Sequence, residues 1–174
     1  MLRIDTNTFN AEDLMNIVED PDMYEQIDEQ FLADITKIAI DVLPEEFPGE
    51  YPAHNTAVVN AYFTALAFYI DGPGIQVTEC ITHNNITRIC SYSAIDAEEN
   101  EYVISFAVRD NRIKIVISYG MIMVAEFNME KLENGIDYSY FIDADNTPYT
   151  MLSLTQVMAT ILEDYVGPQN HKAD

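Results

Sequence analysis

Basic residues are scarce in this sequence. The chain of 174 residues has 8 Lys and Arg against 30 Asp and Glu, which gives a formal net charge of −22 at pH 7. Nucleic-acid binding requires clustered Lys and Arg that neutralise phosphates, and anionic membrane surfaces attract the same cations. The composition therefore disfavours direct contact with nucleic acid or with an anionic membrane. It favours solubility and long-range attraction to a basic partner.

A long, uninterrupted apolar segment is also missing. The longest such segment, Ala57 to Ile70, contains Asn60 and Thr64 and is too short to span a bilayer. Residues 1–5 lack the basic and apolar stretch of a signal peptide. We therefore expect a cytoplasmic protein, in the cytoplasm of a host cell if a phage encodes it.

Cysteine and histidine are few. Cys80 and Cys90 are the only cysteines, and His83 lies between them. The other two histidines, His54 and His171, are distant in the sequence. Structural zinc sites normally take tight ligand pairs from turns, and a second pair is missing here. We therefore expect two reduced cysteines in the core and no metal site.

No catalytic or cofactor-binding motif is recognisable. Gly72-Pro73-Gly74 follows a predicted helix and precedes a strand, whereas a phosphate-binding loop follows a strand and opens a helix. Asp143 to Asn146 begins like a calcium loop, but Pro148 and Leu154 replace its Gly and Glu. An Asx-rich turn explains that segment better. The sequence therefore predicts no catalytic residue and no cofactor.

Hydrophobic periodicity predicts one α+β domain over residues 1–174. An acidic helical segment covers about 1–50, and a buried helix, a sheet and a C-terminal helix follow over about 55–166. Residues 167–174 are expected to fray. We expect the N-terminal helices and the C-terminal helix to pack on one side of a mainly antiparallel β-meander of four to six strands.

Four helices are expected. Asn10 can cap a short helix over residues 11–19, and Asp22 begins a second helix that ends before Pro44. Residues 56–70 have almost no polar face and predict a buried helix. Ser153 can cap the last helix, which ends at Gly167. The second helix has one apolar stripe, made of Ile27, Phe31, Ile35, Ile38 and Val42.

After residue 74 the spacing of apolar residues changes from three or four to two. This alternation continues to residue 142 and predicts strands. Asn84-Asn85 and Asp110-Asn111 are expected hairpin turns. The predicted strands cover residues 75–82, 86–95, 102–108, 113–119, 121–127 and 136–142.

The acidic residues are unevenly distributed. Residues 1–50 hold 14 of the 30 acids, and Arg3 and Lys37 are their only bases. Carboxylates three or four residues apart on a helix lie about 5–6 Å apart, on the scale of the phosphate spacing of a nucleic acid. We therefore predict a partner-binding surface on the second helix, with a second candidate in the acidic loop of residues 96–101. The candidate residues on the helix are Glu25, Asp28, Glu29, Asp34 and Asp41. Those in the loop are Asp96, Glu98, Glu99 and Glu101.

The leading functional hypothesis is a non-enzymatic inhibitor that imitates nucleic acid and binds a basic, nucleic-acid-handling protein such as a nuclease. Phage anti-defence proteins and the immunity proteins of nuclease toxins are of this physical type. The alternative is an acidic chaperone or adaptor that binds a segment of its partner. A third hypothesis is an acid–base enzyme whose residues meet only in the folded chain. The sequence leaves open whether the protein forms a homodimer.

Overall fold

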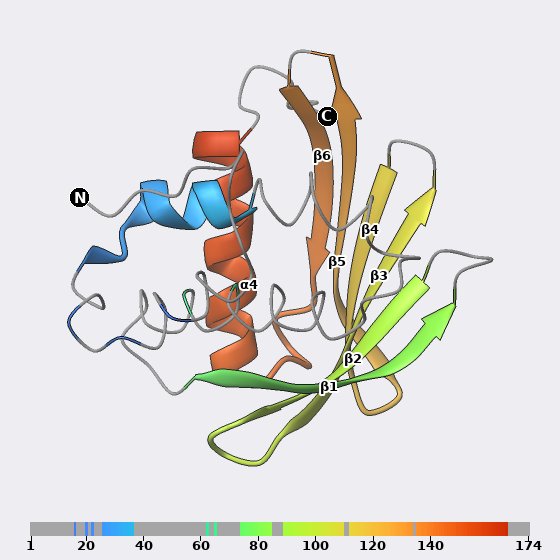
Figure 1. The fold of residues 1–174 in the computed structure, drawn as a ribbon. Coiled ribbons are helices and arrows are strands. Elements are labelled where there is room, and N and C mark those ends of the chain that lie inside the picture. The colour runs from blue at the N-terminus through green and yellow to red at the C-terminus, as the bar shows by residue number, and fades with distance from the viewer. Residues whose placement is uncertain are drawn as a thin grey trace.

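The computed structural model describes residues 26–36, 74–84, 89–109, 112–133 and 135–166, and the single residues Asn16, Asp20, Asp22, Tyr62 and Ala65. Six antiparallel strands form one sheet in the order β1-β2-β3-β4-β5-β6, so that each strand pairs with the next in sequence (Figure 1). This is the α+β meander expected from the alternating apolar pattern, at the upper end of the expected number of strands.

The strands lie close to their predicted positions, and the last helix does not begin where it was expected. The elements are β1 (Ile75–Asn84), β2 (Ile89–Asp96), β3 (Glu101–Arg109), β4 (Arg112–Tyr119), β5 (Ile122–Leu132), β6 (Gly135–Ile142), α4 (Tyr149–Ile161) and the π-helical turn η2 (Leu162–Val166). The largest difference among the strands is β5, which extends five residues beyond the predicted end.

One face of the sheet carries the core. On β2 and β4 buried residues alternate with more exposed ones, as a sheet with one covered face requires. Tyr92, Phe106 and Phe127 are among the largest fully buried side chains on this face. The rings of Tyr92 and Phe106 meet edge to face with centroids 6.0 Å apart. This contact packs β2 against β3 within the core.

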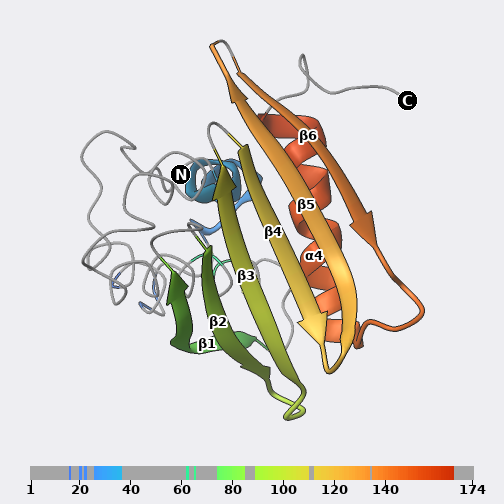
Figure 2. The ribbon, with the colours of Figure 1, turned by 90° about the vertical axis from the view of Figure 1, so that its right-hand side faces the viewer.

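Helices cover that face. Helix α4 lies behind β5 and β6 when the sheet is viewed from its other side, and the helical segment 29–36 lies on the same side as α4 (Figure 2). Thr36, Tyr62, Met158 and Leu162 line one small internal cavity together with side chains of β3, β4 and β5. The helical residues 29–36 and α4 therefore lie on one side of the sheet, and Tyr62 reaches the same cavity.

The opposite face carries polar and charged side chains together with exposed apolar ones such as Val103 and Phe141. The Ser91 and Ser105 hydroxyls lie 2.8 Å apart across β2 and β3. Lys114 Nζ lies 3.3 Å from Glu126 Oε1 across β4 and β5. No helix among the described residues covers this face, which is turned to the viewer in Figure 2.

Two predicted helix starts are wrong. The second helix begins at residue 29 rather than at Asp22, because the Asp28 carboxylate accepts a 2.8 Å hydrogen bond from the backbone N–H of Phe31 and so caps it. Helix α4 begins at Tyr149, four residues before the expected cap Ser153, and has no side-chain cap at its N-terminus. Ser153 lies inside the helix.

Some predicted elements fall outside the described residues. They are the helix over residues 11–19 apart from Asn16, the continuation of the second helix over residues 37–43, and most of residues 56–70. Tyr62 and Ala65, within that last range, are helical and buried. No helix among the described residues has the length and apolar character needed to cross a membrane.

Candidate protein-binding surface at one end of the sheet

Three connections meet at one end of the meander. In an antiparallel meander alternate turns lie at the same end, so the β2–β3 turn, the β4–β5 turn and the β6–α4 loop are neighbours (Figure 1). We call residues 96–101, 120–123 and 143–149 the acidic end. They include six acids, and no Lys, Arg or His: Asp96, Glu98, Glu99, Glu101, Asp143 and Asp145.

Asp96 folds the β2–β3 turn. Its Oδ1 accepts hydrogen bonds from the backbone N–H groups of Glu98 and Asn100, both at 2.9 Å. Its Oδ2 accepts from Asn100 Nδ2 at 2.9 Å and from the Tyr102 hydroxyl at 2.8 Å. Burial by itself would raise the pKa of Asp96, but these hydrogen bonds to the charged form outweigh it and lower the pKa below its ordinary value. Asp96 is thus an internal structural carboxylate.

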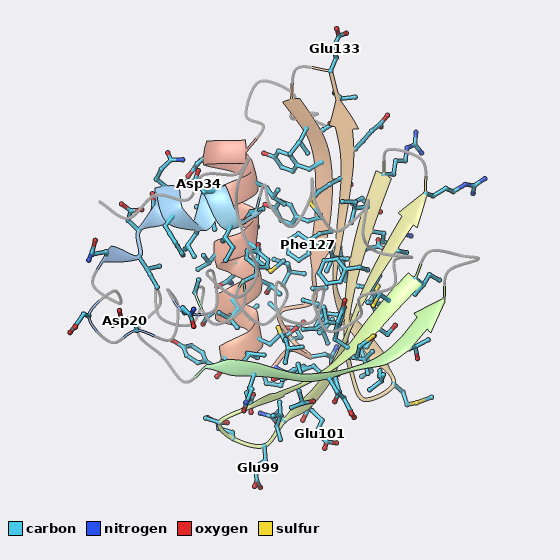
Figure 3. All side chains as sticks on the ribbon, in the orientation of Figure 1. Asp20, Asp34, Glu99, Glu101, Phe127 and Glu133 are labelled. Carbon is cyan, nitrogen blue, oxygen red and sulfur yellow. The ribbon has the colours of Figure 1, made fainter. Side chains whose placement is uncertain are left out.

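The other three acids of this turn point outward. Glu98, Glu99 and Glu101 are exposed, and Figure 3 shows the side chains of Glu99 and Glu101 projecting from this end of the molecule. Glu99 has a φ of +66°, the left-handed conformation that non-glycine residues seldom adopt. Because Asp96 holds the backbone, the turn fixes the positions from which these carboxylates project.

Hydrogen bonds tie the three connections together. The Tyr119 hydroxyl, at the end of β4, donates to Asn100 Oδ1 over 3.1 Å, and the Tyr119 ring lies 5.5 Å from that of Tyr102. The backbone N–H of Asp143 donates to the carbonyl of Val124 in β5 over 2.8 Å. The acidic end is therefore one continuous surface.

The β6–α4 loop is an Asx turn, as its sequence predicts. Asp143 Oδ1 accepts from the backbone N–H groups of Asp145 and Asn146, each at 3.2 Å, and Asn146 Nδ2 donates to Asp143 Oδ2 at 2.7 Å. The Thr147 hydroxyl donates to the Asp143 carbonyl. Asp145 stays exposed and adds a further carboxylate to the surface.

Apolar side chains are exposed at the same end. Met121 is fully exposed, and Ile122 and Met123 are 46% and 40% exposed. Three further large hydrophobic residues that are exposed lie at or close to this end of the sheet: Val103, Phe141 and Tyr149. Exposed apolar groups rimmed by charge are typical of protein-binding surfaces.

The structure places the predicted helix residues elsewhere. Asp34 lies on the helical segment, away from Glu99 and Glu101 (Figure 3). Asp34, which was predicted as part of the partner-binding surface, is only 5% exposed and accepts a 3.1 Å hydrogen bond from Gln30 Nε2. Asp28 is the helix cap described above, and Glu29 is half-buried.

The two sets of predicted acids therefore do not form one surface in the described part of the chain. Of the acidic loop, Glu98, Glu99 and Glu101 are exposed and Asp96 is not. Glu25 and Asp41 lie outside the described residues.

A second cluster of titratable side chains, made of Cys80, Cys90 and Tyr92, packs in the core. Cys80 and Cys90 are free thiols whose sulfur atoms lie 3.3 Å apart, and the Cys90 thiol contacts the Tyr92 hydroxyl at 3.0 Å. Burial raises the pKa of Cys90 to about 12, so its thiol is protonated and unreactive at neutral pH. Among the described residues no three His, Cys, Asp or Glu side chains are grouped to hold a metal ion.

Sequence reasoning missed Asp145 and the exposed residues Met121 to Met123. Asp145 was assigned only to a turn, and the methionines only to the start of a strand. The available signal was the order of residues: apolar side chains directly follow Gly120, where a hairpin turn normally carries polar ones.

Comparison of the chain with protein-family models, with curated proteins and with solved structures found no match. The function is therefore argued from the geometry of this surface alone.

Proposed function

We propose that the protein is a non-enzymatic inhibitor that binds a basic, nucleic-acid-handling protein in the cytoplasm, and that the acidic end is its binding surface. The observation that carries this proposal is the set of exposed carboxylates on a fixed turn, with no base in any of the three adjoining connections. Such a surface attracts a basic groove from a distance and competes there with phosphates.

The geometry favours binding over catalysis. The exposed acids Glu98, Glu99 and Glu101 stand on a turn that projects from the sheet, and the cavity described above is lined almost wholly by apolar side chains. A general acid or base needs a site that holds a substrate against it. Carboxylates on a projecting turn instead suit long-range electrostatic contact with another macromolecule.

Capture from a cell lysate at low salt, followed by elution with a salt gradient, identifies the partner. We expect a basic nuclease or other nucleic-acid-binding protein to elute late. The purified partner should then release its nucleic acid as this protein is added. The apparent affinity of this protein for the partner should fall as ionic strength rises. A captured partner that binds this protein and nucleic acid simultaneously would contradict the inhibitor proposal.

The exposed apolar residues favour one second candidate, an acidic adaptor or chaperone that binds a segment of its partner. Met121 to Met123 offer the apolar contact that such binding requires. Simultaneous binding of nucleic acid by the captured partner would support this candidate, so the same competition experiment separates the two.

We also propose that the N-terminal helices, including the range 11–19 and the residues between 37 and Pro44, complete the layer over the covered face of the sheet. Ile27, Phe31 and Ile35 are buried as the predicted apolar stripe requires, which supports the proposal.

A further inference from the structure

The β4–β5 turn carries more apolar surface than its fold requires. Gly120 has a φ of +62°, so a glycine suits the first position of this two-residue turn. The backbone conformation does not require methionine at position 121, and the Met121 side chain is fully exposed. Ile122 and Met123, the next two residues, are also exposed, and they lie on opposite faces of the start of β5 because they pair with Tyr119 and Ser118.

We propose that Met121, Ile122 and Met123, here called the apolar ridge, anchor a basic amphipathic segment of the partner protein. This inference rests on the proposed function, because it assigns part of the acidic end to one kind of partner segment. In the complex, apolar side chains of the segment cover the ridge, and Lys or Arg side chains beside them meet the carboxylates on either side.

Charge complementarity selects this occupant. The β2–β3 turn with Glu98 and Glu99 is tied to β4 through Tyr119, and the loop with Asp145 is tied to β5 through the bond from Asp143 to Val124. Carboxylates therefore flank the ridge from both neighbouring connections. A second copy of this chain or a nucleic acid would bring like charge against like charge, which disfavours binding.

The ridge is suited to an apolar contact that charge alone cannot provide. Methionine side chains are flexible and polarizable, so they adapt to differently shaped apolar partners. Val124 is the extra residue of a β-bulge opposite Ile117 and Ser118, and both Val124 and Ala125 are fully buried beneath the ridge. The backbone of the turn is thus fixed before binding, which lowers the entropic cost of ordering it.

The probe for this proposal is a helix-forming peptide with Leu on one face, Lys on the other and a single Trp. The protein has no Trp, so the emission of the peptide reports binding without background from the protein. A second peptide keeps the Lys and Trp residues and replaces every Leu by Ser. We expect the amphipathic peptide to bind more tightly than the second one, and its Trp emission to shift to shorter wavelength.

The variant that tests the ridge is the double substitution Met121→Ser with Met123→Ser. It should lower the affinity for the amphipathic peptide by about tenfold or more and leave binding of the second peptide unchanged. The matched control is Leu132→Ser, since Leu132 is 36% exposed at the opposite end of β5. Circular dichroism should show an unchanged fold, because Met121 is fully exposed.

Other outcomes separate the ridge from the proposed function. If Glu98→Lys with Glu99→Lys weakens binding of both peptides while the methionine variant binds normally, the ridge is refuted and the acidic surface stands. If the wild-type protein binds neither peptide at low salt, both proposals fail. A dimer of the wild-type protein that the methionine variant abolishes in sedimentation would assign the ridge to a second copy and overturn the proposal.

Discussion

The two ends of the sheet use their charged residues differently. Where β3 joins β4, Arg112 Nε lies 3.6 Å from Glu130 Oε2 on the neighbouring strand, and further along β4 Lys114 pairs with Glu126. At the acidic end no base is present, and Asp96 is the carboxylate that the fold buries in its own turn. Strands of the same meander reach both ends, so the fold does not require the difference.

The two ends also differ in which charges are available to a partner. Cross-strand pairs such as Arg112 with Glu130 partly neutralise one another at the surface and contribute little stability. Glu98, Glu99 and Glu101 have no base near them in their own or the adjoining connections, so their repulsion is a cost that a basic partner would relieve.

The largest expected effect lies in the core that both ends share. Phe127 is fully buried on β5 (Figure 3). Its ring lies 5.9 Å from that of Tyr140. Phe127→Ala should lower the free energy of unfolding by about 3–5 kcal/mol. Chemical denaturation measures this loss, with Met121→Ala as the exposed control, for which we expect no measurable change. A loss below about 1 kcal/mol for Phe127→Ala would place Phe127 outside the core.

The next effect separates the internal carboxylate of the acidic end from the exposed ones. Asp96→Ala removes the acceptor of four hydrogen bonds and should cost about 2–3 kcal/mol of stability at neutral pH. Glu98→Gln, on the same turn, should change stability by less than about 0.5 kcal/mol. Equal effects of the two substitutions would contradict the distinction between structural and exposed acids.

The pH dependence of Asp96 has a definite sign. The pKa of its carboxylate is lower in the folded protein than its ordinary value of 3.8, so the folded state favours the charged form. Its contribution is therefore fully present above the unfolded pKa and is lost as the pH falls through the folded pKa. The stability difference between wild type and Asp96→Asn should shrink below about pH 4, as urea denaturation at several pH values would show. A difference that stays constant down to pH 2 would contradict this.

The smallest effect concerns the backbone of the two turns at this end. Glu99→Gly should stabilise the protein by about 1 kcal/mol, because glycine adopts the φ of +66° without strain. Gly120→Ala should destabilise it by a similar amount, since φ is +62° there although an added Cβ would contact nothing within 4 Å. Thermal unfolding measures both, and destabilisation by Glu99→Gly would show that this conformation carries no strain.

Much of the sheet could be predicted from the sequence. Alternation of apolar residues located every strand, because one covered face imposes a period of two on β2, β3 and β4. The start of α4 could not be found in this way. The N-cap position is Pro148, whose side chain has no hydrogen-bonding group, and the helix begins without a side-chain cap. A search for capping residues therefore finds Ser153 and misses the true start.

The candidate site was predicted only in part, for two physical reasons. Asp34 was predicted to face a partner because an amphipathic helix buries only its apolar side. Residues 31–36 are instead buried on all sides, so Asp34 lies inside. In the loop of residues 96–101 the four acids are equivalent in sequence. Only the folded turn shows that Asp96 accepts the internal hydrogen bonds and that Glu98, Glu99 and Glu101 are left to solvent.

The most direct test of the central claim compares charge reversal at the two ends. Glu98→Lys with Glu99→Lys changes the acidic end, and Glu133→Lys with Asp164→Lys makes the same change in net charge at exposed positions elsewhere. Affinity for the captured basic partner is measured across a salt series. We predict that the first pair lowers affinity by about tenfold or more at low salt and flattens the salt dependence, while the second has a much smaller effect. Equal losses for the two pairs would show that only the net charge matters and would contradict a binding surface at the acidic end.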